Sequence, residues 1–150
     1  MNNINIIGDK CCGCQVCLSV CPRDAIIQKS GLRGELLYYA NEKCINCGRC
    51  LKVCVAINLN LNIKSPFFYK AISNNQKVLE KSSSGGIAYE LAYESIKNGA
   101  LVYGATWDIE EQKVKHKCID GFEKLSELQG SKYVQSFIDK SIYREIKNSI

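Results

Sequence analysis

Two runs of closely spaced cysteines limit what this chain can fold into more than any other feature of its sequence. Each run has the spacing CxxCxxCxxxC, and each cysteine of the second run lies 33 residues after its counterpart in the first. A constant offset over four positions indicates an internal duplication, not a general enrichment in cysteine. The eight positions are Cys11, Cys14, Cys17, Cys21, Cys44, Cys47, Cys50 and Cys54.

This spacing is typical of ligands to 4Fe-4S clusters. Three thiolates two residues apart can occupy three corners of a cubic cluster, whereas the fourth, after a longer gap, is directed toward the other cluster. The sequence therefore predicts two clusters with crossed ligands. Structural zinc fits less well, because zinc sites take two CxxC pairs per ion. One cluster would be held by Cys11, Cys14, Cys17 and Cys54, and the other by Cys44, Cys47, Cys50 and Cys21.

The distribution of cysteine also bears on folding. Nine of the ten cysteines precede residue 55, so this segment has few positions left for a hydrophobic core. Metal binding must then supply much of its folding energy. In a reducing compartment such a cysteine-dense segment indicates metal binding more than a disulfide framework.

Three other potential ligands lie outside this pattern. Cys12 is a conceivable substitute ligand, but the other spacings of its run fit Cys11. Cys118 is isolated and is predicted to be a small buried apolar residue. His116 alternates with three lysines, so we expect it to point inward as a hydrogen-bonded core histidine.

Charge and hydropathy exclude several classes of function. The formal net charge of +5 falls to roughly +1 when two clusters of about −2 each are counted. This near-neutral balance favours an attached electron partner over a freely diffusing one. No block of Lys or Arg suggests nucleic-acid binding. Because the sequence shows neither a signal-peptide pattern nor about 18 consecutive apolar residues, it predicts no membrane span and a cytoplasmic location.

The predicted fold class is α+β, with a two-cluster ferredoxin-like module followed by an incomplete α/β domain. Residues 1–60 form the ferredoxin-like domain, in which residues 4–7 and 35–40 are predicted strands. Residues 61–84 are assigned to a linker and a first strand at 67–72, and the Asn-rich stretch 58–66 marks the boundary.

Residues 85–150 are assigned to the second, truncated domain. Ile, Leu and Ala four residues apart predict a helix over residues 87–98, which Gly99 ends as a left-handed cap. Residues 101–107 and 113–119 are predicted to form a hairpin, and residues 122–129 a helix. Ser136 and Asp139 form a capping-box pattern that predicts the start of a last helix.

The serines and glycines of residues 82–86 directly precede the predicted helix. Hydroxyl groups and glycine amides at a helix start can hold a phosphate at the positive end of the helix dipole. The residue types alone favour a simpler interpretation, which is a helix cap with a flexible lead-in.

Three blocks in a fixed order carry a resemblance to a known family. Residues 81–86 (KSSSGG), 99–104 (GALVYG) and 130–136 (GSKYVQS) follow the cysteine runs. This arrangement closely resembles the coenzyme F-420 hydrogenase/dehydrogenase beta-subunit family. The resemblance implies an iron–sulfur flavoprotein of anaerobes that exchanges electrons between coenzyme F-420, a bound FAD or FMN, and the clusters. It implies flavin contacts at Ser83, Ser84, Gly85, Gly86, Lys132 and Tyr133, and it identifies no catalytic residue.

The same resemblance leads us to expect that the chain is the N-terminal portion of a longer oxidoreductase. Family members continue with a further strand and a GTPCQ-like segment, which this sequence lacks. A flavin between F-420 and the clusters would convert two-electron into one-electron transfer, and a redox protein or subunit would be the partner. The alternative is a ferredoxin-like electron carrier with an interaction domain and no catalytic activity of its own.

Overall fold

The computed structural model of the chain describes residues 1–32, 34–59 and 67–150. The chain divides into two compact units. One comprises residues 1–63 together with 138–150, and the other comprises residues 64–137. Each unit is described by itself below. Part of the predicted 58–66 boundary lies outside the described residues.

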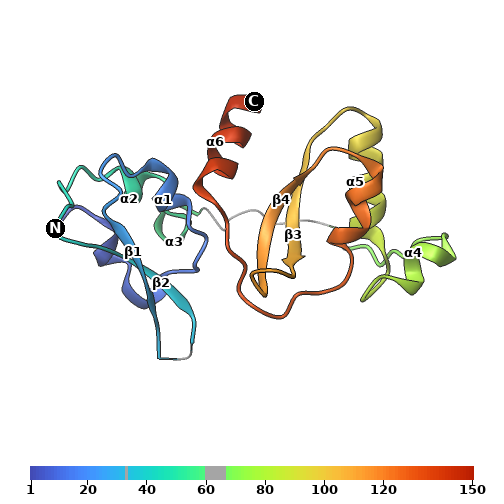
Figure 1. The fold of residues 1–150 in the computed structure, drawn as a ribbon, viewed down its shortest axis with the longest axis horizontal. Helices are drawn as coiled ribbons and strands as arrows, with labels where there is room; N and C mark the ends of the chain where they lie inside the picture. The colour runs from blue at the N-terminus through green and yellow to red at the C-terminus, as the bar shows by residue number, and fades with distance from the viewer. Residues whose placement is uncertain (33, 60–66) are drawn as a thin grey trace. The chain divides into compact units, whose positions relative to one another are not determined.

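The first unit consists of short elements around a small antiparallel hairpin (Figure 1). In the hairpin, Ile26 of β1 lies opposite Ala40 of β2, which confirms the second predicted strand. The core contains isoleucines, Tyr38 and several of the cysteines themselves. The elements are η1 (Ile4–Ile6), η2 (Gly8–Lys10), α1 (Val16–Val20), β1 (Ile26–Ser30), β2 (Leu36–Ala40), α2 (Arg49–Lys52) and α3 (Val55–Asn58).

The strand prediction for residues 4–7 is wrong, because this segment forms a 3-10 helix. Ile4 and Ile7 are buried, whereas Ile6 is exposed. Residues three apart share one face of a 3-10 helix, so this spacing buries both isoleucines together. Asn3 caps the helix by accepting a hydrogen bond from the backbone N–H of Asn5.

The duplication in the sequence is repeated in the backbone. Gln15 precedes α1 with φ/ψ of 65°/0°, and Gly48 precedes α2 with 73°/0°. The fourth cysteines match as well, since Cys21 has φ/ψ of −74°/115° and Cys54 has −73°/114°. The two cysteine runs therefore follow nearly the same path in space, including a left-handed residue before each helix.

The last helix, α6 (Lys140–Ser149), belongs to the first unit and contacts α1. The predicted capping box is wrong. The N-cap is Asp139 itself, whose carboxylate accepts a hydrogen bond from the backbone N–H of Ser141 at 2.8 Å. The Asp139 carboxylate supplies the acceptor that a backbone N–H of the first turn needs. The helix therefore begins directly after Asp139 and not after Ser136.

Three polar contacts attach α6 and its lead-in to the first cysteine run. The side-chain carbonyl of Gln15 accepts a hydrogen bond from the backbone N–H of Ile138 at 3.0 Å. The Tyr143 hydroxyl donates to the backbone carbonyl of Cys14. Lys140 forms a 2.9 Å ion pair with Asp24. Ile142 adds a buried apolar contact.

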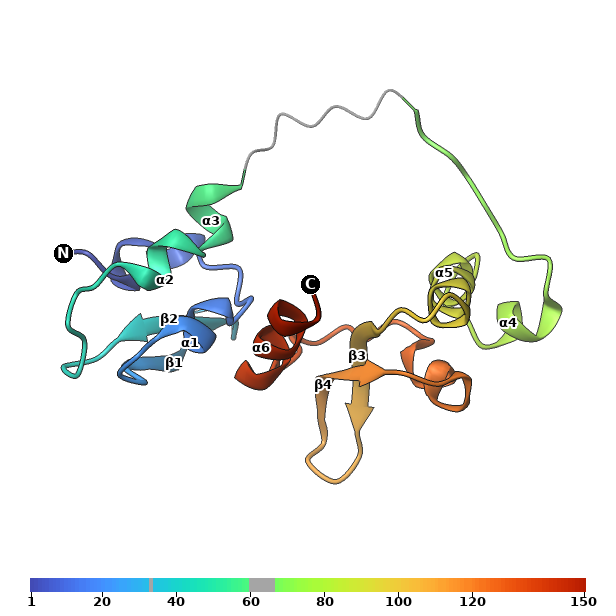
Figure 2. The same cartoon turned by 90° about the horizontal axis from the view of Figure 1, so that it is seen from above.

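The second unit is a hairpin covered on one face by helices, as the views of α5, β3 and β4 show (Figure 2). Its core contains Ala92 of α5, Ile119 of β4 and Leu125 of η3. The predictions of a helix, of its cap at Gly99 (φ 79°) and of an antiparallel hairpin are confirmed. The elements are α4 (Gln76–Glu80), α5 (Ile87–Lys97), β3 (Val102–Asp108), β4 (Lys113–Ile119) and η3 (Phe122–Leu128).

Two predictions for this unit need correction. Residues 67–72 form no strand. The next residue, Ser73, donates its backbone N–H to the carbonyl of Gly85 at 2.7 Å, so the chain here pairs with the loop before α5 and not with a strand. The helix predicted over residues 122–129 is a 3-10 helix. A third chain segment instead adds to the hairpin at Phe137, which forms a parallel bridge to Lys115.

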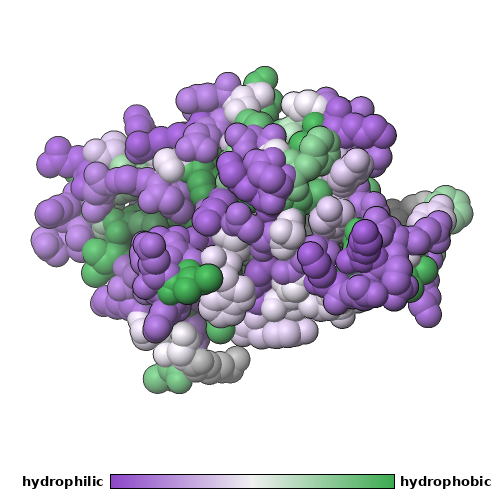
Figure 3. Space-filling view, turned by 45° about the vertical axis from the view of Figure 1, so that its right-hand side comes forward, coloured by the Kyte–Doolittle hydropathy of each residue, from purple (hydrophilic) through white to green (hydrophobic). Residues whose placement is uncertain are grey.

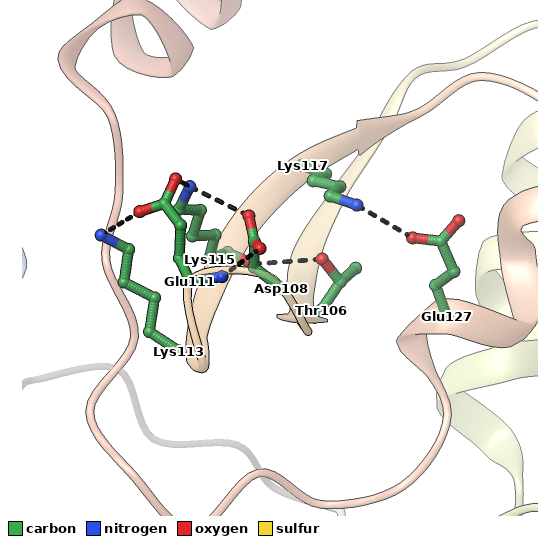
Figure 4. Close-up of polar contacts among 7 residues, drawn as sticks. All are labelled: Thr106, Asp108, Glu111, Lys113, Lys115, Lys117 and Glu127. Carbon is green, nitrogen blue, oxygen red and sulfur yellow. Dashed lines mark hydrogen bonds and ion pairs between the residues drawn. The ribbon is translucent and has the colours of Figure 1, made fainter.

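Charged side chains tie the hairpin together (Figure 4). Lys115 pairs with Asp108 at 2.9 Å and also with Glu111, while Lys117 pairs with Glu127 of η3 at 3.4 Å. Hydrogen bonds from the Glu111 N–H and from Lys115 lower the pKa of Asp108, and those from Lys113 and Lys115 lower the pKa of Glu111. These contacts favour the ionised carboxylates at neutral pH.

The surface is mostly polar. On the face drawn in Figure 3, hydrophobic residues form separate patches among hydrophilic ones. Among the described residues, no helix is both long enough and apolar enough to cross a membrane.

Candidate iron–sulfur centres and ligand pocket

Four of the predicted ligands line one cavity in the first unit. They are Cys44, Cys47 and Cys50 of the second run and Cys21 of the first. Apolar side chains complete the wall, among them Ile26, Ala40 and Ile45. This is the set that the crossed pairing assigns to one cluster, and the apolar wall would keep water from it.

The thiols of the other four predicted ligands interact with one another and also with thiols outside that set, Cys12 and Cys50. Burial raises the pKa of Cys14, and the nearby thiols of Cys12 and Cys54 raise it further. Burial, followed by the charges of Cys14 and Cys11 and then Cys50, raises the pKa of Cys17 to about 12. Cys54 therefore lies close enough to the first run to interact with Cys14. Such thiols resist ionisation unless a cation compensates their charge, which is what iron binding supplies.

Local backbone geometry positions the sulfur atoms. The left-handed residues Gln15 and Gly48 turn the chain so that α1 and α2 each begin between the second and third cysteine of a run. Backbone N–H groups then face two of the sulfurs. The N–H of Ala25 donates to Cys21 Sγ at 3.2 Å, and that of Asn46 donates to Cys44 Sγ at 3.4 Å. Hydrogen bonds of this kind stabilise thiolates and tune a bound cluster.

The three potential ligands outside the cysteine pattern, Cys12, Cys118 and His116, differ in exposure and in hydrogen bonding. Cys12 is exposed, while Cys11 packs against the core. Cys118 is half-buried. His116 is also half-buried. Its Nδ1 has no hydrogen-bond partner among the described residues. Burial lowers the pKa of His116, whereas a hydrogen bond with the backbone of Phe137 acts on the imidazole and raises its pKa. Among the described residues, no three Cys, His, Asp or Glu side chains converge on a site for a single metal ion.

The second unit contains a pocket of about 480 Å³ that is formed by all three blocks of the resemblance. Ser83 joins two of them, because its hydroxyl oxygen accepts a hydrogen bond from the backbone N–H of Ser131 at 2.7 Å. Gly104 supplies the third wall from β3. The start of α5 faces the same pocket, and its N-cap Gly86 offers no side-chain cap to the first turn. An anionic group could accept hydrogen bonds from that turn.

Four of the six predicted flavin contacts line this pocket and two do not. Ser83, Ser84, Gly86 and Lys132 are lining residues. Gly85 instead packs against the chain before α4, since a Cβ there would lie 2.6 Å from the Ala71 carbonyl oxygen. Tyr133 is 91% exposed and does not line the pocket.

The ammonium group of Lys132 uses two of its hydrogen-bond donors within its own loop. Its ammonium group donates to the backbone carbonyls of Glu127 at 3.0 Å and Gln129 at 2.9 Å, which holds the end of η3. Burial lowers the pKa of Lys132. The lysine therefore contributes positive charge at the pocket wall while it fixes the loop that follows η3.

Sequence reasoning missed Gln129 as a pocket residue. Its side-chain amide donates to the carbonyl of Val78 at 3.2 Å and to the hydroxyl of Ser82 at 3.2 Å, and so connects the loop after η3 to the start of the serine block. A polar residue directly before the GSKYVQS block was the only signal for this role in the sequence.

The family-model match falls in the first unit. Residues 3–55 match the family model described as a 4Fe-4S dicluster domain. The chain is 39% identical over 51 residues to the polyferredoxin protein MvhB of Methanothermus fervidus, which covers 31% of this chain and 12% of that protein. It is 38% identical over 47 residues to the ferredoxin-type protein NapH of Haemophilus influenzae, which covers 30% of this chain and 16% of that protein.

The chain thus spans only a small part of the length of these curated relatives. Residues 3–55, which match the family model, hold both cysteine runs. Residues 3–55 are therefore an iron–sulfur module of the 4Fe-4S ferredoxin type, with a role in electron transfer.

Proposed function

We propose that this chain holds two 4Fe-4S clusters with crossed ligands and passes single electrons between them as part of a flavin-dependent oxidoreductase of the coenzyme F-420 type. The observation that carries the cluster assignment is the cavity lined by Cys21 together with Cys44, Cys47 and Cys50. In a crossed arrangement Cys54 completes the other set, with Cys11, Cys14 and Cys17.

The flavin assignment draws its support from the pocket of the second unit. Its volume of about 480 Å³ lies in the range of small-molecule sites. Serine hydroxyls, the start of α5 and Lys132 provide donors and positive charge for a phosphate-bearing ligand, and Val102, Ala105 and Leu128 provide apolar walls for a ring. When bound, a flavin would exchange two electrons with F-420 and single electrons with the clusters.

Ser83 and Gln129 would act as positioning residues for this ligand. Ser83 holds the backbone of Ser131 in place, and Gln129 holds the hydroxyl of Ser82. Together they fix the pocket wall before the ligand arrives, which reduces the entropy lost on binding.

Anaerobic purification followed by iron, sulfide and flavin analysis tests the proposal. We expect about eight iron and eight sulfide per chain. Stoichiometric zinc without sulfide would refute the cluster assignment. FMN and FAD are then titrated against the chain and against Lys132→Met, with Lys124→Met as the control, because Lys124 is an exposed lysine paired with Asp120 outside the pocket.

A second candidate is an electron carrier with an interaction domain and no reaction of its own. It is favoured by the names of the two relatives, a polyferredoxin and a ferredoxin-type protein. Two results together would favour the carrier over the flavoenzyme. The clusters would load fully without any flavin binding, and reduced F-420 would not reduce the clusters even when flavin is supplied.

A further inference from the structure

A groove in the first unit collects four positive side chains beside a predicted cluster ligand. It has a volume of about 640 Å³ and lies between α1, α2 and α6. Arg49 and Lys52 of α2 and Arg144 and Lys147 of α6 line it, and none of its lining residues in the described part of the chain is Asp or Glu.

The placement of these cations is ordered. Each pair is spaced three residues apart on its helix, so both members of a pair share one face. All four side chains are exposed. The two pairs come from helices that are far apart in the sequence, and α6 reaches its position through the contacts of Tyr143 and Lys140.

Unlike six of the other lysines, these four cations form no ion pair with a carboxylate among the described residues. Lys97, Lys113, Lys115, Lys117, Lys124 and Lys140 are all paired with carboxylates. Over residues 1–32, 34–59 and 67–150, no ion pair involves a cation of the groove. Gathering like charges is unfavourable unless opposite charge lies nearby. The proposed cluster beside Cys21 and the carboxylates of Asp24 and Asp139, on which Arg144 acts, supply part of that charge. An acidic partner would supply more.

Cys21 connects the groove to the redox centre. It lines the groove, and it also lines the cavity with Cys44, Cys47 and Cys50. A protein seated in the groove would therefore lie against a ligand of the second predicted cluster, where the path for an electron is short.

We infer that this groove docks a redox protein with an acidic surface, which exchanges one electron at a time with the cluster held by Cys21. The inference rests on the proposed clusters but not on the proposed flavin. In the exchange, one electron leaves a reduced cluster and enters a one-electron acceptor, and no bond or proton is transferred. Opposite charges on the two surfaces would raise the association rate at low salt.

The test uses the full chain with its clusters loaded and reduced. Stopped-flow absorbance follows electron transfer to plastocyanin, an acidic one-electron acceptor, and to cytochrome c, a basic one. Menadione, which is small and uncharged, reports cluster reactivity without docking. The groove variants are Arg144→Gln/Lys147→Gln and Arg49→Gln/Lys52→Gln. The matched control Lys29→Gln/Lys43→Gln removes two exposed charges of the same unit that do not line the groove.

We expect each groove variant to lower the second-order rate constant with plastocyanin at least tenfold at low salt. The control should change it less than threefold, and added salt should erase the difference. Rates with menadione should stay unchanged, and cytochrome c should show no such loss.

Three outcomes would overturn the inference. Equal losses in groove and control variants would mean that only net charge matters. A parallel loss with menadione would mean that the cations set the cluster potential and do not dock a protein. Inhibition of the plastocyanin reaction by phosphate, beyond that of chloride at equal ionic strength, would assign the groove to a small anion. Absence of iron and sulfide would instead refute the proposed clusters, and the inference with them.

Discussion

Removing two cysteines, either one from each run or both from the second run, tests the crossed ligands directly. In the crossed arrangement Cys54 shares a cluster with Cys11, whereas Cys44 shares the other with Cys21. Each single alanine variant should lose one cluster, so bound iron should fall from about eight to about four per chain. The cavity shared by Cys21 and three cysteines of the second run is the observation that the double variants test.

Cys11→Ala/Cys54→Ala should retain about four iron atoms, since both changes damage the same cluster. Cys44→Ala/Cys54→Ala should retain almost none, since each change damages a different one. Iron and sulfide analysis and native mass spectrometry after anaerobic reconstitution give the counts. Cys12→Ala is the control and should keep the full content, because Cys12 is exposed and outside the pattern. If the two double variants give the reverse counts, the clusters are not crossed.

Three further predictions concern the framework around these sites. Gly104→Ala should destabilise the second unit by less than about 1 kcal/mol, because the new methyl carbon would lie 2.6 Å from Leu128 Cδ2, the end of a half-buried side chain that can move aside; a loss of several kcal/mol in urea unfolding would contradict this. Tyr143→Phe should remove about 1 kcal/mol of α6 docking by deleting the hydrogen bond to the Cys14 carbonyl. Hydrogen exchange in α6 should then be about fivefold faster, while exchange in the β3–β4 hairpin of the second unit should be unchanged. Lys115 is one of the groups that lower the pKa of Asp108 and Glu111. The contribution of these carboxylates to hairpin stability is therefore present above the ordinary carboxyl pKa range and is lost as the pH falls through the lowered values. Lys115→Met should flatten this acid dependence in thermal unfolding scans.

The ligand positions could be predicted from the sequence because cluster binding depends on a local pattern. The spacing of the eight cysteines specifies the chemistry without any knowledge of the fold. The hairpin of the second unit was also predictable, since alternating residues flank the turn before Lys113. In these segments local preference and tertiary structure agree.

The remaining features depend on contacts that sequence periodicity does not contain. Ile4, Ile6 and Ile7 fit a short strand as well as a 3-10 helix, and only burial of Ile4 and Ile7 distinguishes them. The position of α6 depends on contacts such as that between Gln15 and Ile138, which are 123 residues apart. The groove was missed for the same reason, because two helices that are far apart in the sequence each supply only two of its charges.

The matched backbone of the two cysteine runs has a consequence for the origin of this module. With ligands crossed as we propose, a peptide that contained a single run would supply three ligands to one cluster and its fourth ligand to another molecule. Two identical peptides would then be needed to complete either cluster. The equal geometry at Gln15 and Gly48, and at Cys21 and Cys54, is what would remain if a symmetric pair of such peptides had been joined into one chain.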